Sequence, residues 1–180
     1  WFGYEHYGIA PDIMALAKGI ASGLPLGAMV ARSEIMDWEA GSHASTFGGN
    51  PVSCAAALAT IELVEESLME NAAVQGERLL AGLKTLQTGC EPIGDVRGKG
   101  LMVAVELVTD RIKKTPAKEW RDRTIRCAFE KGLLLLGCGE NSIRFCPALT
   151  ASAQEVDMCL SLFEESLRDA VENRQGGNRS

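Results

Sequence analysis

The sequence predicts an α/β protein, and three local patterns carry that prediction. Every second residue from 101 to 107 is apolar, which is the period of a strand with one buried face. Asn50 followed by Pro51 is a typical helix start, because the asparagine side chain accepts N–H groups and proline suits the first helical position. Ser152 and Glu155 form a capping box ahead of an apolar helical stripe.

The first half of the chain is expected to contain a strand hairpin and then two helices. Apolar runs at residues 12–17 and 26–31 flank a turn rich in glycine and proline, which predicts two short strands around that turn. Residues 51–66 are apolar on most sides and predict a buried helix. Residues 68–86 predict a second helix with leucines along one side.

The second half is expected to combine strands and helices in a separate domain, and we place the domain boundary near residue 90. Helices are predicted at residues 116–131 and from Ser152 onward, and a polar tail at residues 173–180 is expected to fray. A turn is predicted at residues 97–100. The predicted strands are residues 92–96, 101–108, 133–136 and 142–145.

Composition excludes several classes of function. The net charge of -6 and the absence of a basic cluster argue against nucleic-acid binding. No apolar stretch is long enough to cross a bilayer. The 6 cysteines include no Cys-x-x-Cys pair, which favours buried free thiols in a reducing cytosol, and we expect a cytoplasmic protein. The chain opens on Trp1 without an initiator methionine, so we expect it to be a piece of a longer polypeptide.

Lys18 is the first candidate for chemistry. It lies between an apolar run and a turn that contains Gly19 and Gly23, and no acidic residue occurs within five positions of it. Apolar flanks would desolvate the amine and favour its neutral, nucleophilic form. Glycines would let the backbone approach a ligand, which is the arrangement that a Schiff-base enzyme needs. The alternative is an ordinary surface lysine at the end of a strand.

Four segments in order resemble class III pyridoxal-phosphate-dependent aminotransferases, the group of 4-aminobutyrate and other omega-amino-acid transaminases. Residues 12–23, with Asp-Ile-Met, Ala-Lys and Ser-Gly at the family's spacing, resemble its lysine signature. Residues 45–51, Ser-Thr-Phe-Gly-Gly-Asn-Pro, resemble its second marker. Residues 96–102 and 142–150 resemble segments of its small domain. The resemblance covers essentially the whole chain.

The resemblance implies the fold of a fold-type I pyridoxal-phosphate-dependent transferase. Residues 1–90 would be the C-terminal part of its large cofactor-binding domain, and residues 91–180 its small C-terminal α+β domain. The family's acid that pairs with the pyridine nitrogen, its phosphate loop and its stacking aromatic would lie upstream of Trp1. We therefore expect this chain alone to bind cofactor poorly and to turn over slowly or not at all.

The resemblance also assigns roles to three residues. Lys18 would form the Schiff base with pyridoxal 5'-phosphate and then move a proton on the substrate. Thr46 would bind the cofactor phosphate, in this family usually across a homodimer interface; its alternative is a local turn or capping hydroxyl. Arg144 would bind the substrate carboxylate; its alternative is an internal salt bridge. His6 and His43 lack metal-ligand spacing, so no metal is expected.

The activity that the resemblance implies is transfer of an amino group from an amine or amino acid, such as an omega-amino acid, to a keto acid. The partners would be these small molecules and a second subunit that shares the active sites. One alternative keeps the scaffold and changes the reaction to that of an aminomutase, racemase or decarboxylase. Another is a non-catalytic fragment that serves in dimerisation.

Overall fold

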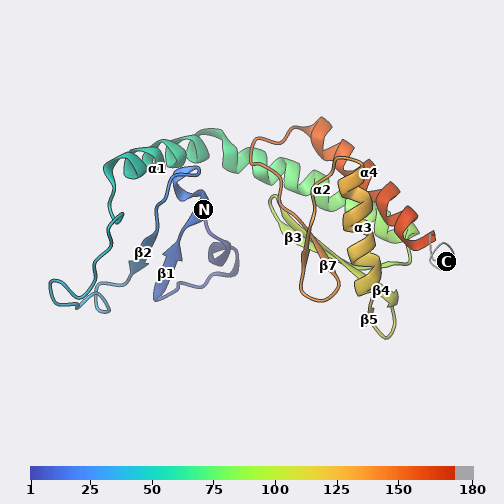
Figure 1. Cartoon of the computed structure of the whole chain (residues 1–180), viewed down its shortest axis with the longest axis horizontal. Helices are drawn as coiled ribbons and strands as arrows, with labels where there is room; N and C mark the ends of the chain where they lie inside the picture. Colours follow the sequence, from blue (N-terminus) through green and yellow to red (C-terminus); the bar gives the residue numbers. More distant parts are fainter. Residues whose placement is uncertain (173–180) are drawn as a thin grey trace. The chain divides into compact units, whose positions relative to one another are not determined.

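A computed structural model describes residues 1–172 of the chain, which divides into two units. The first unit is Trp1–Met69, and the second begins at Glu70 (Figure 1). Helix α2 (Met69–Gly89) belongs to the second unit except for its first residue, and its Leu79 and Leu83 lie in the core of that unit. The domain boundary expected near residue 90 stays a prediction, since a unit of local contacts need not coincide with a domain.

The first unit is built on a hairpin of two antiparallel strands, as the sequence predicts. Strand β1 (Ile13–Leu16) pairs with β2 (Ala28–Ala31). All residues of the two strands are exposed or half-buried, although most are apolar. A 3₁₀ turn, η2 (Lys18–Ala21), leaves the end of β1, and a second one, η1 (Gly3–Tyr7), precedes the hairpin. Lys18 therefore lies in the connection between two paired strands, where it was expected.

Helix α1 (Pro51–Leu63) begins at the predicted cap. The Asn50 side chain accepts the backbone N–H groups of Val52 and Ser53 at 3.0 and 3.2 Å, which satisfies two donors at the helix start. A π-helical turn, η3 (Val64–Leu68), follows α1 and precedes α2. The cap thus determines where the polar loop ends and the helix begins.

The burial predicted for this helix is wrong for the chain described here. Leu58 is 69% exposed, and only Ser53 and Ala57 are buried. The alanine-rich sequence of α1 suits contact on several sides, but within residues 1–172 most of its residues stay exposed or half-buried, and its main contact beyond the adjoining η3 is with turn η2. An apolar helix can therefore be recognised from its sequence although the chain itself does not bury it.

The second unit contains an antiparallel sheet with the strand order β3-β4-β7-β6, and the short strand β5 lies outside this order and pairs with the end of β4 (Figure 1). These strands are β3 (Ile93–Lys99), β4 (Met102–Asp110), β5 (Thr115–Pro116), β6 (Leu136–Cys138) and β7 (Ser142–Phe145). Because every pairing is antiparallel, neighbouring strands place directly opposed residues on the same face.

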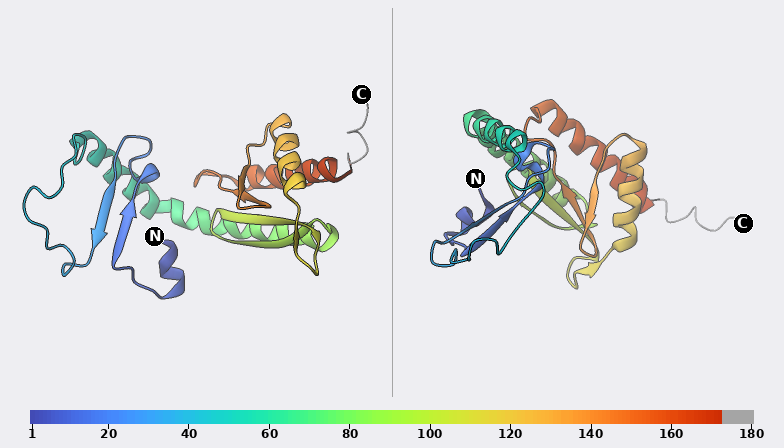
Figure 2. Two further views of the ribbon diagram at one scale, coloured as in Figure 1. Left: turned by 60° about the horizontal axis from the view of Figure 1, so that its bottom comes forward. Right: turned by 60° about the vertical axis from the view of Figure 1, so that its left-hand side comes forward.

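Helices α2, α3 (Lys118–Glu130) and α4 (Ala153–Glu172) contribute to one core with this sheet. Helices α3 and α4 are in contact, and Figure 2 shows them crossing at an angle. The predicted alternation in the second strand is confirmed, since Val103, Val105 and Leu107 are all buried. The stripe of the last helix is confirmed as well, and its buried members are Val156, Phe163 and Leu167.

Two strand boundaries differ from the prediction. The turn expected at residues 97–100 is instead the end of β3, because Gly100, with φ of 49°, makes the reversal. Gly98 remains in the strand, where a Cβ would lie 2.5 Å from the Met102 carbonyl oxygen. The strand expected at residues 133–136 begins only at Leu136. The fraying expected at residues 173–180 lies outside the described residues.

The capping box at the start of α4 forms as predicted. The Glu155 carboxylate accepts the backbone N–H of Ser152 at 2.7 Å, and Ser152 Oγ accepts the N–H of Glu155 at 3.3 Å. The Ser152 hydroxyl also donates to the Glu155 carboxylate at 2.8 Å, and the backbone and hydroxyl donors of Ser152 together lower the pKa of Glu155.

All six cysteines are free thiols, as expected, but their burial is only partial. Cys146 is exposed and the other five are half-buried. Burial raises the pKa of Cys159 to about 11. Within residues 1–172, none of the helices combines the length and apolar character that a bilayer crossing requires.

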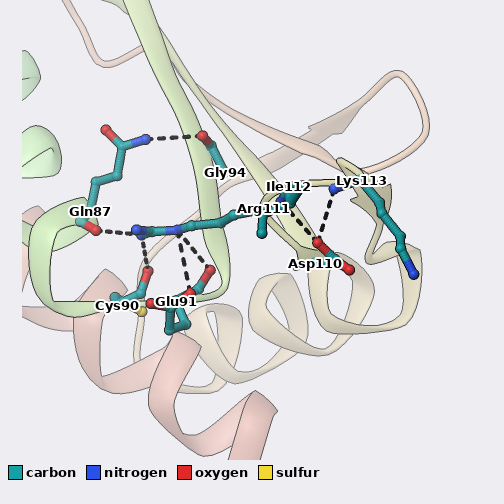
Figure 3. Close-up of polar contacts among 8 residues, drawn as sticks. All are labelled: Gln87, Cys90, Glu91, Gly94, Asp110, Arg111, Ile112 and Lys113. Atoms are coloured by element: carbon teal, nitrogen blue, oxygen red, sulfur yellow. Dashed lines mark hydrogen bonds and ion pairs between the residues drawn. The ribbon is translucent and has the colours of Figure 1, made fainter.

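Arg111 closes the C-terminal end of α2 (Figure 3). Its Nη2 donates to the carbonyl oxygens of Gln87 and, at 2.7 Å, of Cys90, and its Nε donates to that of Glu91 at 3.1 Å. The Gln87 side chain in turn donates to the Gly94 carbonyl at 3.1 Å. These bonds satisfy carbonyls that a helix end leaves without a partner, and they join α2 to the start of β3.

We predict that Arg111→Met lowers the free energy of unfolding of the second unit by about 2 kcal/mol, because several charge-assisted hydrogen bonds are lost. Urea titration followed by circular dichroism measures the change. Arg126→Met is the control, since Arg126 is an exposed helix residue without an ion pair in the described chain. Equal stability of the two variants would contradict the capping role of Arg111.

Candidate active site

Lys18 has a left-handed backbone conformation, with φ of 56°. This region is uncommon for residues other than glycine, because the Cβ atom approaches the carbonyl oxygen. Among residues 1–172, Ser22 and Lys114 are the two further non-glycine residues with positive φ. Two of the three therefore occur within one short turn, and such clustered strain is typical of functional sites.

Contacts with α1 hold this turn in place. Ala21 is 1% exposed and is the buried residue of η2, which packs on α1. Ser22 Oγ lies 2.8 Å from Thr60 Oγ1 of α1, and Thr60 itself donates to the Ala56 carbonyl. Ser22 is therefore the donor in the bond between the two hydroxyls. This anchor offsets part of the strain of about 1–3 kcal/mol that a left-handed residue carries.

The turn borders an open hollow of about 470 Å³. Its lining residues are Lys18, Gly19, Ser22, Gly23, Leu24, Pro25 and Leu26. The Lys18 side chain is exposed, and it makes no hydrogen bond or ion pair with any described residue. The apolar, desolvating surroundings predicted for this amine are therefore wrong for the described chain, because the flanks of the turn are themselves exposed.

Thr46 is an exposed residue of the loop between β2 and α1. Its hydroxyl makes no hydrogen bond within the described residues, and the cap of α1 is Asn50 rather than Thr46. Two backbone hydrogen bonds form turns in this loop: the Gly48 N–H donates to the Ser45 carbonyl and the Asn50 N–H to the Phe47 carbonyl, both at 3.3 Å. A hydroxyl close to a helix start and without a partner can bind an anion.

Arg144 lies in the middle of β7, between Ile143 and Phe145, which are both buried in the core. Alternation along the strand places the Arg144 side chain on the opposite face of the sheet. Its Nε atom is buried and has no hydrogen-bond partner, and no described residue forms an ion pair with it. The arginine thus carries an unpaired charge at a partly buried position.

Arg97 is a functional candidate that sequence reasoning missed, since it was placed in a turn. In the structure it lies in β3, and its Nη1 donates to Asp95 Oδ2 at 2.5 Å and to Glu106 Oε2 at 3.0 Å. These two carboxylates raise the pKa of the guanidinium. The sequence signal for placing Arg97 on a strand is the alternation of the charged residues Asp95, Arg97 and Lys99, which indicates that the strand continues through Gly98.

The structure assigns Lys18 and Thr46 to the first unit and Arg144 to the second. Within residues 1–172, no three His, Cys, Asp or Glu side chains gather as metal ligands would. The first unit thus carries an amine on a strained turn and a hydroxyl before a helix, and the second unit separately carries an unpaired guanidinium on its sheet.

Comparison with known proteins decides the family. The sequence profile described as "Aminotransferase class-III" matches residues 1–167. The chain belongs to the class III aminotransferase family. This family is pyridoxal-phosphate-dependent, and the four sequence segments that resemble it are thereby explained.

Relatives of this aminotransferase chain include enzymes of two kinds. It is 40% identical to an acetylornithine aminotransferase of Caldanaerobacter subterraneus subsp. tengcongensis over 93% of this chain and 41% of the relative. It is 44% identical to a 4-aminobutyrate aminotransferase of Mycobacterium leprae, over 93% and 38%. It is also 41% identical to a leucine/methionine racemase of Thermococcus litoralis, over 98% and 40%.

Solved structures agree on the fold. The crystal structure of a transaminase from the marine bacterium Virgibacillus matches with a TM-score of 0.89 and 31% identity, over 96% of this chain and 42% of that one. The chain thus has the mixed α/β fold of part of a pyridoxal-phosphate-dependent transaminase. It spans about 41% of the length of the first relative and of the transaminases that it resembles in structure.

The described residues fit pyridoxal 5'-phosphate. The exposed amine of Lys18 borders a hollow whose lining includes Gly19 and Gly23, where no side chain separates a ligand from the backbone. The unpartnered hydroxyl of Thr46 suits a phosphate oxygen.

We predict that Lys18→Gly raises the free energy of unfolding by about 1 kcal/mol relative to Lys18→Ala, because glycine adopts positive φ without strain. Urea titration followed by tryptophan fluorescence measures both variants. Lys114→Gly against Lys114→Ala is the matched control, since Lys114 has a φ of 53°. A glycine variant at position 18 that is no more stable than the alanine variant would contradict the strain at Lys18.

Proposed function

We propose that this chain supplies the covalent lysine and a substrate-binding arginine to a pyridoxal-phosphate-dependent aminotransferase. The reaction would move an amino group from an amine or amino acid, in particular an omega-amino acid, to a keto acid. The observation that carries the proposal is Lys18, whose unpaired amine projects from a strained turn beside an open hollow. Residues held in such conformations are concentrated at functional sites.

Lys18 would hold the cofactor and then act on the substrate. Pyridoxal phosphate, when bound, supplies an aldehyde that reacts with amines and a ring that accepts electrons. The Lys18 amine, once displaced, is a base that can take a proton from the amine-bearing carbon of the substrate and return it elsewhere. Because η2 is anchored to α1 by Ala21 and Ser22, the backbone of this base is held in one place.

Thr46 would bind the phosphate of the cofactor with its hydroxyl. The free hydroxyl and the nearby start of α1 support this role. The same loop exposes Trp38 by 57% and Phe47 by 67%, and exposed aromatic residues are enriched at interfaces. We therefore propose a homodimer in which Thr46 serves the active site of the second subunit. The free thiols support a cytoplasmic location.

Arg144 would bind the carboxylate of the substrate. A guanidinium matches a carboxylate with two parallel hydrogen bonds, which orients the substrate as well as binding it. The lack of an ion pair at Arg144 within the described chain supports this role over that of an internal salt bridge. Substrates with a carboxylate would then be favoured over simple amines.

Racemisation of an amino acid is the second candidate function, because a leucine/methionine racemase is 41% identical to this chain. Both reactions need the same base at Lys18, and they differ in whether the amino group leaves. Product analysis after incubation of the complete enzyme with a single L-amino acid and no keto acid discriminates them. Formation of the D-amino acid favours racemisation, and a requirement for a keto acid favours transamination.

Reductive trapping tests the proposed function. The chain is mixed with pyridoxal phosphate, reduced with borohydride, digested and analysed by mass spectrometry for pyridoxyl-lysine. We expect the label on Lys18 and little on Lys114, which is also exposed and left-handed but has no phosphate-binding residues assigned to it. Equal labelling of the two lysines would contradict a cofactor site at Lys18.

A further inference from the structure

The face of the sheet opposite the core carries alternating charges. We call it the charged face, formed by Asp95 and Arg97 of β3, Ala104 and Glu106 of β4, and Arg144 of β7. Arg97 is paired with Ala104 and Ala104 with Arg144, so the two arginines flank one small residue across three strands. Ala104 itself carries no polar group that could pair with either arginine.

Glu106 lies within reach of both arginines. On β4 it is two residues from Ala104, so it is a diagonal neighbour of Arg97 on one side and of Arg144 on the other. Diagonal neighbours in an antiparallel sheet are about 7–8 Å apart, which long side chains can span. Glu106 could therefore neutralise either guanidinium.

The structure shows which arginine Glu106 binds. Its Oε2 accepts from Arg97 Nη1 at 3.0 Å, while Arg144 has no ion pair in the described chain and a buried Nε without a partner. Asp95, which is paired with Glu106 across the strands, binds the same Nη1 at 2.5 Å. Without Arg97, two carboxylates would face each other, and their repulsion would favour pairing of Glu106 with its diagonal neighbour Arg144.

We propose that Arg97 is a positioning residue that holds Glu106 away from Arg144 and so keeps Arg144 available for a carboxylate ligand. The proposal deepens the function proposed above and rests on the role of Arg144 in it. A carboxylate substrate competes with Glu106 for Arg144, and an internal acid on the same face would have a high effective concentration. Sequestering Glu106 on Arg97 removes this competitor.

The test measures how fast phenylglyoxal, which modifies free guanidinium groups, reacts with Arg144 in the 180-residue chain. Peptide mass spectrometry quantifies the adduct, and exposed, unpaired Arg126 is the internal reference. We expect Arg97→Gln to slow modification of Arg144 by about threefold or more, because Glu106 then pairs with it. Arg97→Gln combined with Glu106→Gln should restore the rate, and Arg97→Lys should retain it.

Two outcomes would overturn the proposal. One is an Arg144 rate in Arg97→Gln equal to that of the unchanged chain, with the Arg126 rate also unchanged. The other uses Glu106→Gln alone, which leaves Arg97 in place and does not depend on whether Arg97→Gln folds. If that variant speeds modification of Arg144, Glu106 already occupies Arg144 and Arg97 does not hold it away.

Glutarate, a dicarboxylate probe, separates this proposal from the proposed function. Protection of Arg144 by glutarate in the unchanged chain, lost in Arg97→Gln and restored in the double variant, supports both. Protection that Arg97→Gln leaves intact overturns the positioning role and leaves carboxylate binding by Arg144 in place. A lack of protection by glutarate, together with the expected rates in the variants, overturns carboxylate binding and leaves the positioning role in place.

Discussion

The anchoring of a left-handed turn against a helix is the constraint on which the first unit depends. Ala21 is buried against α1, and Ser22 is bonded to Thr60, so the turn between β1 and β2 keeps its strained conformation. A lysine on a flexible loop would lose conformational entropy each time it bound a ligand. On this turn the backbone of Lys18 is already ordered by folding, so ligand binding causes no further loss of its conformational entropy. The same anchor therefore serves both the local fold and the proposed chemistry.

The second unit is organised by the difference between the two faces of its sheet. One face packs with three helices into a core that includes Val105 and Ile143. The other face bears the charges, and β7 alternates between the two. An arginine there can keep part of its side chain buried while its end meets a ligand. The rigidity of the core thus fixes the position of Arg144 without using its charge.

Much of this fold was accessible from the sequence, because local rules decide it. The cap at Asn50, the box at Ser152 and the alternation in β4 each depend on neighbouring residues, and each was predicted correctly. The exposure of Lys18 and of most of α1 was not predicted, because exposure depends on which surfaces the rest of a chain covers. Sequence gave no indication of the positive φ at Lys18, and the pairing of Arg97 with Glu106 requires the sheet register.

If Lys18 and Thr46 bind the same cofactor, replacing either residue should weaken the affinity for pyridoxal phosphate. Isothermal titration would compare the cofactor-free complete enzyme with its Lys18→Gly and Thr46→Val variants and with the control Lys114→Gly. We expect the first two variants each to weaken binding by about tenfold or more, which is roughly 1.4 kcal/mol, and the control to bind as the unchanged protein does. Equal affinities in all four proteins would contradict the account.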